Sequence, residues 1–231
     1  METDRSIVDR PKLLGDSVAK AQRLAQLREQ HIAPLTGFVE ELRLEAGSGA
    51  AIPNFDPWDA GVAAEILFLL EAPGARAVAS SFVSRNNPDE TAKNMFELNR
   101  DACIPRIKSL LWNAVPWYIG DGARIRAATA KDLEAGLAPL PRLIQMLPKL
   151  RAVVFMGRKA EKARPQVARL RPDLALFSCP HPSPLFVNNR PGNREIILNV
   201  FREAARYLGE SRGAAAEELE LGAEKSPSKA V

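Results

Sequence analysis

The chain has 231 residues, of which 46% are hydrophobic and 26% are charged, a composition typical of one globular domain with a substantial core. It contains no apolar run of about twenty residues and no signal-peptide core at its start, so we expect a cytoplasmic protein without a membrane span. Cys103 and Cys179 lack the paired spacing of zinc or iron–sulfur ligands, and we therefore expect neither a metal nor a cofactor. The formal net charge of +4 admits a polyanionic partner without requiring one.

The first fifty residues are predicted to be helical. One apolar face repeats at the helical spacing i, i+3, i+4 and i+7, formed by Leu35, Phe38, Val39 and Leu42. His31 lies between two helical stretches with no reactive side chain near it in the sequence, and we interpret it as structural. A proline-rich loop over residues 52–59 separates this helical part from the rest of the chain.

Beyond that loop, short apolar runs alternate with amphipathic segments. The runs cover residues 66–70, 110–115, 152–156 and 174–178, and the last helix is predicted to begin near Asn193. Continuously apolar strands between helices are typical of a parallel sheet that is covered on both faces. We therefore predict a three-layer α/β/α sandwich with a central four-stranded parallel sheet, preceded by N-terminal helices.

The chain is predicted to form a single domain over residues 1–210, of which 1–50 are the helical N-terminal part. Residues 211–231 are rich in alanine, glutamate, serine and lysine and contain no aromatic residue. This composition predicts a disordered tail.

Polar side chains follow each of the four predicted strands. Right-handed crossovers bring the carboxyl ends of parallel strands to one edge, where open α/β sheets bind ligands. That edge should collect Glu71, Asn113, the basic turn 157–159 and His181. Each residue also has a purely structural interpretation. Glu71 could cap the next helix, and Asn113 could hydrogen-bond backbone groups of a loop. The joint occurrence of these residue types at one edge favours a functional site.

The segment after the fourth strand is His181-Pro182-Ser183-Pro184-Leu185. Each proline fixes its own φ, so the segment is predicted to be a stiff loop. Such a loop would hold one imidazole and one apolar side chain in fixed places.

The order of these segments resembles the uracil-DNA glycosylase superfamily over about residues 53–208. Glu71-Ala72-Pro73-Gly74 is similar to the first motif of its iron–sulfur branch. The segment from His181 to Leu185 is similar to the last motif of its best-known branch, including the intercalating leucine. Phe82 falls at the place of the family's base-stacking phenylalanine, and Asn113 at that of its uracil-reading asparagine.

The resemblance implies a monofunctional DNA-repair hydrolase that flips uracil out of DNA and cuts the N-glycosidic bond, leaving an abasic site. Phe82 would stack on the flipped base, and Asn113 would read its Watson–Crick edge, because a carboxamide offers both a donor and an acceptor. His181 would donate a hydrogen bond to the departing base. Glu71 would position or deprotonate the attacking water, or stabilise the cationic sugar. Ala72 and Gly74 would complete the pocket for the base.

The implied partner is uracil-containing DNA, single- or double-stranded, bound by a monomer. Leu185, stiffened by Pro184, would wedge into the base stack. Contacts to phosphates or to the opposite strand are expected from Gly157, Arg158, Ser183, Asn189 and Arg190.

The sequence departs from the family motifs at several places. Leu70 stands where the first motif opens with glycine, and Ala72 where the best-known branch has its catalytic aspartate. Gly74 stands where that branch excludes thymine with a tyrosine. The four cluster cysteines are missing, and we expect the N-terminal helices to support the site instead.

Alternative functions remain open. The protein could excise another deaminated base such as hypoxanthine, or bind uracil or abasic DNA without catalysis. An unrelated small-molecule hydrolase could use Glu71 and His181. Lys159 keeps a lyase mechanism open, because its amine could act as a nucleophile.

Overall fold

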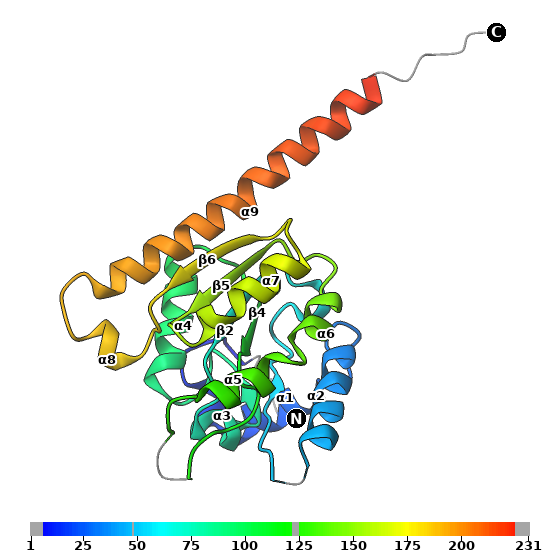
Figure 1. Cartoon of the computed structure of the whole chain (residues 1–231). Helices are drawn as coiled ribbons and strands as arrows, with labels where there is room; N and C mark the ends of the chain where they lie inside the picture. Colours follow the sequence, from blue (N-terminus) through cyan, green and yellow to red (C-terminus); the bar gives the residue numbers. More distant parts are fainter. Residues whose placement is uncertain (1–6, 48, 122–124, 225–231) are drawn as a thin grey trace, which may run out of the picture.

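A central sheet of four parallel strands organises the computed structural model, which describes residues 7–47, 49–121 and 125–224, with side chains to residue 209 (Figure 1). The strands, in the spatial order β4-β2-β5-β6, are β4 (Ser109–Asn113), β2 (Ile66–Leu70), β5 (Ala152–Met156) and β6 (Ala175–Cys179). The predicted four-stranded parallel sheet is confirmed. Every residue of β2, β4 and β5 is buried, as expected for strands covered on both faces, whereas the edge strand β6 is mostly only half-buried.

Helices cover both faces of this sheet. Their bounds are α1 (Ser17–Ala25), α2 (Ala33–Ala46), α3 (Ala75–Ser80), α4 (Glu90–Asp101), α5 (Ala130–Leu137), α6 (Leu140–Gln145), α7 (Arg164–Leu170), α8 (Pro184–Val187) and α9 (Asn193–Glu224). Single 3₁₀ turns occur at residues 13–15, 61–63, 106–108 and 160–163. No helix in the described ranges is both long enough and apolar enough to cross a membrane.

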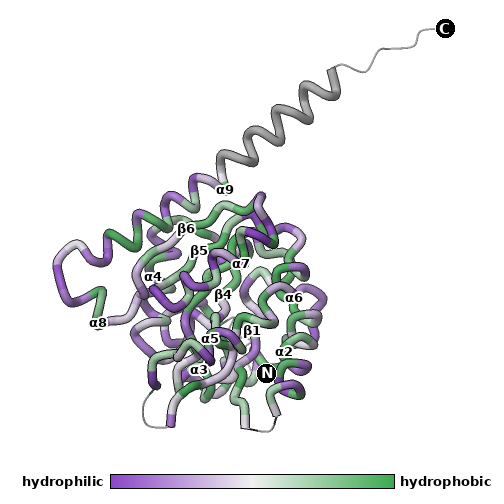
Figure 2. The backbone as a smooth tube through the Cα atoms, viewed as in Figure 1, coloured by the Kyte–Doolittle hydropathy of each residue, from purple (hydrophilic) through white to green (hydrophobic). Residues whose placement is uncertain are grey.

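The alternation of side chains along the strands explains the three layers. Phe68 of β2 packs against Phe201 of α9, with ring centroids 4.8 Å apart. Phe68 is paired in register with Leu111, so the next residue of β4, Trp112, faces the opposite side of the sheet. There Trp112 stacks on Phe55 at 3.9 Å and contacts Phe38 of α2. The predicted three-layer α/β/α sandwich is confirmed, and hydrophobic residues run along the central strands (Figure 2).

A second, two-stranded sheet was not predicted from the sequence. β1 (Asn54–Phe55) and β3 (Phe82–Val83) pair in parallel beside the main sheet, with β1 inside the proline-rich loop. Two-residue strands are too short to produce a periodic hydrophobic pattern, which explains why the sequence did not reveal them.

The N-terminal helices pack as the sequence predicted. The apolar face of α2 is buried, as is the preceding residue Ile32. His31 Nε2 lies 2.7 Å from the carbonyl oxygen of Pro57 and must donate to it, which supports a structural role. Gly61 allows this close packing, because its φ is +56° and a Cβ there would lie only 2.0 Å from the carbonyl oxygen of His31.

A buried ion cluster joins the N-terminal part to the sheet. It consists of Arg23, Asp56, Asp59, Arg85 and Arg106, all nearly inaccessible to solvent except Arg106. Arg23 and Arg106 both hydrogen-bond Asp56, and Arg106 Nε lies 2.8 Å from Asp59. Burial raises the pKa of Asp59 to about 6, although Arg106 and Arg85 act against this shift.

The end of the chain differs from the sequence prediction. The last helix α9 continues to Glu224, whereas residues 211–231 were predicted to be a disordered tail. Alanine and glutamate, which dominate this stretch, have high helix propensity, and the low hydrophobicity that suggested disorder does not oppose helix formation. Residues 225–231 lie outside the described residues.

Candidate active site

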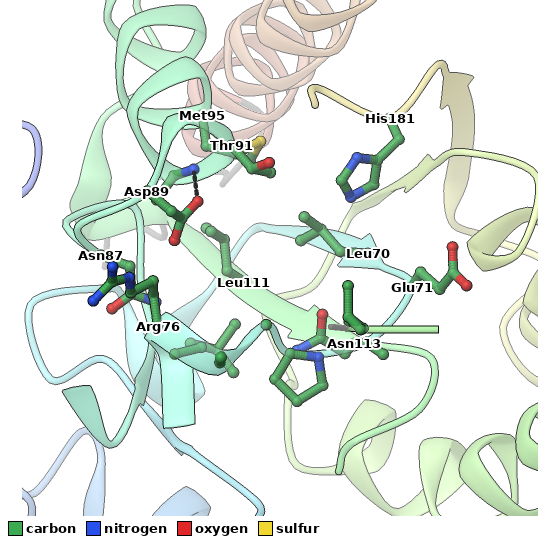
Figure 3. A pocket seen from close by; sticks show the side chains of 18 of the residues that line it. Leu70, Glu71, Arg76, Asn87, Asp89, Thr91, Met95, Leu111, Asn113 and His181 are labelled. Atoms are coloured by element: carbon green, nitrogen blue, oxygen red, sulfur yellow. Dashed lines mark hydrogen bonds between the residues drawn. The ribbon is translucent and has the colours of Figure 1, made fainter. Parts of the chain in front are cut away.

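A cavity of about 520 Å³ opens at the carboxyl edge of the main sheet (Figure 3). Its lining includes Glu71 after β2, Asn113 at the end of β4, and His181 after β6. Three predicted site residues, which lie at the carboxyl ends of three different strands, therefore meet in one cavity. Backbone bonds hold two of these strand ends together, because Ala114 N donates to the oxygen of Leu70 and Val115 N to that of Glu71.

Asn113 lines this cavity and carries an unused hydrogen-bond donor. The residue is 4% exposed, and its Nδ2 is buried without a hydrogen-bond partner among the described residues. A buried amide that lacks a partner costs roughly 1–3 kcal/mol. Because the cavity lies next to this amide, a ligand with an acceptor atom could remove that cost.

Glu71 is half-buried and has one of its oxygens occupied. Oε1 accepts a hydrogen bond from the backbone N of Ala128 at 2.7 Å. Among the described residues, none donates a hydrogen bond to Oε2. This second oxygen can therefore accept a proton or a hydrogen bond from a molecule in the cavity.

The burial of His181 favours the uncharged form of its imidazole. Burial lowers the pKa of the imidazole below its ordinary value, while the carboxylates of Glu71 and Asp89 act in the opposite direction. At neutral pH the ring is therefore neutral and carries one N–H donor.

Two contacts fix the backbone around His181. Asn94 of α4 donates from Nδ2 to the carbonyl oxygen of Pro182 at 2.8 Å. On the other side, Gly157 has a φ of +90°, and a Cβ there would lie 3.1 Å from the Cβ of His181. Gly157, which was predicted to contact DNA, thus leaves room for the backbone and Cβ of His181.

The structure places Phe82 away from the cavity, in contrast to its predicted stacking role. Phe82 is fully buried in β3, and the next residue, Val83, lines the cavity instead. Successive side chains of a strand point to opposite sides, so only one of the two can face the ligand. No Phe, Tyr or Trp ring occurs among the described lining residues, and the apolar walls include Val83, Met95 and Leu111.

The first motif forms one end of the cavity. Leu70, Ala72 and Gly74 all line it, as predicted for the last two. A Cβ at Gly74 would meet no atom within 4 Å. The cavity is therefore open at the place where the resembled branch excludes thymine with a tyrosine.

The predicted DNA-contacting residues lie outside the cavity. Leu185 of α8 is 84% exposed, and Arg158, Asn189 and Arg190 are exposed as well. Pro184 is the first residue of α8, and Ser183 caps this helix by accepting a hydrogen bond from Phe186 N at 3.3 Å. Since α8 contacts α4, which contributes Met95 to the cavity, the exposed leucine lies on an element next to the site.

Some lining residues were not identified from the sequence. Asp89 caps α4, accepting a hydrogen bond from Ala92 N at 2.9 Å, and the Asn-Pro-Asp sequence before a helical pattern could have revealed this cap. Arg76 and Arg126 are exposed cations that also line the cavity, and Arg126 pairs with Asp132 at 2.6 Å. Their position depends on tertiary folding, and no local sequence signal marks it.

The described ranges contain no group of three or more His, Cys, Asp or Glu side chains that could hold a metal ion. Cys103 and Cys179 are both free thiols.

The comparison with protein families agrees with the sequence resemblance. The model of the uracil DNA glycosylase superfamily matches residues 58–205. Among solved structures, the chain is similar to a candidate uracil DNA glycosylase from Methanosarcina acetivorans, with 18% identity, a TM-score of 0.45, and coverage of 61% of this chain and 91% of that chain. It is also similar to SMUG2 of Pedobacter heparinus, with 12% identity, a TM-score of 0.47, and coverage of 64% and 76%. No curated protein matches the sequence significantly. Because the family match spans more than half of the sequence, the chain belongs to the uracil DNA glycosylase superfamily.

Proposed function

We propose that this protein is a monofunctional DNA glycosylase that excises uracil by base flipping and hydrolysis, leaving an abasic site. The observation that carries the proposal is the unpaired, buried amide of Asn113, which faces the same cavity as Glu71 and His181. A carboxamide, a carboxylate and a neutral imidazole can supply base reading, water activation and leaving-group stabilisation in the hydrolysis of an N-glycosidic bond.

Asn113 distinguishes uracil from cytosine by its hydrogen-bonding groups. Its Nδ2 donates to O4 of uracil, and its Oδ1 accepts from N3–H. Cytosine presents an amine and an unprotonated nitrogen at these positions, so the same amide orientation mismatches both. The aliphatic side chains of Val83, Met95 and Leu111 give the flipped ring an apolar surface.

His181 acts on the base and Glu71 on the sugar side of the glycosidic bond that breaks. As the bond between C1′ and N1 breaks, its electron pair leaves with the base, and the neutral imidazole of His181 donates a hydrogen bond to O2. Water attacks C1′ of the cationic sugar and transfers a proton to Glu71. Ala128 holds Oε1 of this carboxylate, which leaves Oε2 to receive that proton.

DNA is held outside the cavity. Leu185 enters the base stack, and Arg158, Asn189 and Arg190 contact phosphates or the opposite strand. Arg76 and Arg126 add positive charge beside the flipped nucleotide. Binding should weaken as salt concentration increases, because phosphate contacts release counterions.

The position of Lys159 supports hydrolysis without lyase activity. Its Nζ donates to the carbonyl oxygen of Ala128, and Lys159 is not among the residues that line the cavity. Borohydride should therefore trap no covalent complex between protein and DNA. A trapped complex would identify an amine nucleophile and contradict the hydrolytic mechanism.

The test of the proposed function is release of free uracil from single- and double-stranded oligonucleotides that contain one uracil. We expect an alkali-labile abasic site with uracil and none with cytosine at that position. A strand that stays intact at high protein concentration would contradict catalysis. Tight binding of uracil DNA without release would instead identify a noncatalytic binding protein, and a lack of salt-sensitive DNA affinity would favour a small-molecule hydrolase.

Hypoxanthine is a second candidate base, favoured by the open space beside Gly74. Its O6 and N1–H offer Asn113 the same acceptor and donor as O4 and N3–H of uracil. Comparing the rates of release of the two bases from the same oligonucleotide will rank them.

We further propose that the protein acts as a monomer in the cytoplasm, which size-exclusion chromatography and localisation of a tagged chain will test.

A further inference from the structure

The turn after β5 lies against His181 and is also hydrogen-bonded to Ala128, the residue that binds Glu71. Gly157 lies against the Cβ of His181, as described above. Two residues later, Lys159 is half-buried and donates from Nζ to the carbonyl oxygen of Ala128. The mechanism proposed above gives this half-buried ammonium group no part in the chemistry.

Ala128 connects the lysine to the carboxylate. The residue is 1% exposed, its carbonyl oxygen accepts from Lys159, and its backbone N donates to Oε1 of Glu71 at 2.7 Å. The two residues before it, Arg126 and Ala127, line the cavity together with Glu71. The position of Ala128 therefore affects both the orientation of the carboxylate and the cavity wall beside it.

The far end of this segment is fixed independently of the lysine. Thr129 begins α5 in a capping box with Asp132, and Arg126 pairs with the same aspartate. These bonds fix residues 126–132 to one another but not to the sheet. Among the described residues, the side-chain hydrogen bonds that tie Ala128 to the ends of the strands come from Glu71 and Lys159.

We propose that Lys159 is a positioning residue for Glu71, acting through Ala128. By holding the carbonyl of Ala128, the lysine places the N–H that binds Oε1, and it thereby keeps Oε2 directed at the attacking water. This inference rests on the proposed glycosylase function, because it assigns Glu71 to water activation.

The test uses Lys159→Met, Lys159→Arg, Glu71→Gln and the double variant Lys159→Met/Glu71→Gln in single-turnover uracil release. Supporting residues of this kind typically change activity by about 10–100-fold, so we expect Lys159→Met to slow excision by at least roughly 10-fold. Lys159→Arg keeps a donor and should recover most of the rate. In the double variant, the lysine substitution should cause no further slowing beyond Glu71→Gln, because the two residues act as one unit.

Lys162→Met is the matched control, because Lys162 is exposed on the following turn and also carries one positive charge. Both lysine variants should lose the same small amount of affinity for abasic DNA, and only Lys159→Met should slow base release. Multiplicative slowing in the double variant, or equal rates for the two lysine variants, would overturn the proposal.

Hydrogen exchange at the Ala128 amide gives a readout that does not depend on catalysis. Exchange should be faster in Lys159→Met than in Lys159→Arg or in the unsubstituted protein, since the segment loses its bond to the lysine. Unchanged exchange would overturn the positioning role. Absence of uracil release by the unsubstituted protein would instead contradict the proposed function, and exchange would then decide the link between Lys159 and Ala128 by itself.

Discussion

In the proposed mechanism, base recognition depends on the side-chain amide of Asn113. Replacing it by aspartate keeps the size of the side chain but removes the donor to O4 and adds a negative charge near the leaving base. We expect Asn113→Asp to lower the single-turnover rate of uracil release on the order of 100-fold, as for loss of other buried catalytic hydrogen bonds. The control is Asn199→Asp on the exposed surface of α9, which makes the same chemical change away from the cavity. Equal rates for the two variants would remove Asn113 from the site.

His181 should act as a neutral donor throughout the neutral range. Because burial lowers its pKa, excision should not decline between pH 7 and 8 as it would if the imidazolium were required. The lowered pKa also means that the stability contributed by His181 is present above its unfolded value of about 6.5 and is lost as the pH falls through the lower folded value. Titration of the two histidines by NMR, assigned with a His31→Gln variant, measures the shift directly. A folded pKa above 6.5 for His181 would contradict the neutral donor.

Leu185 offers a test of DNA entry. Leu185→Ala should slow excision from duplex DNA roughly 10-fold and leave the single-stranded substrate nearly unaffected, because only the duplex must be unstacked and unpaired. Leu44→Ala is the matched control, since Leu44 is 83% exposed and Leu185 is 84% exposed. Equal losses on both substrates would indicate that Leu185 does not act as a wedge.

The turn after β5 is the element whose shape controls the place of the imidazole. Gly157→Ala adds a methyl group 3.1 Å from the Cβ of His181 at a φ of +90°. Gly192→Ala imposes the same strain at a φ of +88°, with nothing within 4 Å of the added carbon. Both substitutions should cost about 1–2 kcal/mol of unfolding free energy from left-handed backbone alone. Only Gly157→Ala should also slow excision, by roughly 10-fold or more, because it displaces a reacting group.

Elements with a long or continuous hydrophobic pattern could be predicted from the sequence. The parallel arrangement followed from four apolar runs, and it correctly brought Glu71, Asn113 and His181 to one cavity. The orientation of Phe82 could not be predicted in this way, because a two-residue strand has no period that determines which residue faces inward. Asp89 and Arg126 reach the cavity through tertiary packing, which no local pattern encodes.

Across the entire chain, the buried ion cluster holds the N-terminal part to the cavity wall. Ser84 lines the cavity and donates to Asp56, while Asn86 donates to Asp9 Oδ1 at 2.8 Å. The bond of Asn86 connects the N-terminal part directly to the segment from Ser84 to Asn87, and the bond of Ser84 does so through Asp56, which binds Arg23. They are consistent with the prediction that the N-terminal residues support the site.

Removing one ion of this cluster should destabilise the fold strongly. Arg23→Met leaves Asp56 buried with one cation fewer, and loss of one partner of a buried pair typically costs about 3–5 kcal/mol. Arg28→Met, which breaks the exposed pair with Glu40, should cost at most about 1 kcal/mol. Urea denaturation of the two variants measures the difference. Similar midpoints would indicate that the cluster contributes little net stability.

The interdependence of these charges also constrains how the sequence can evolve. A change of Arg23, Asp56 or Arg106 alone leaves an opposite charge buried without compensation, and selection should remove most such single changes. Related sequences are therefore expected to keep these residues together or to replace them together with apolar ones. Such correlated replacement would identify relatives that share this N-terminal support, independently of the catalytic motifs.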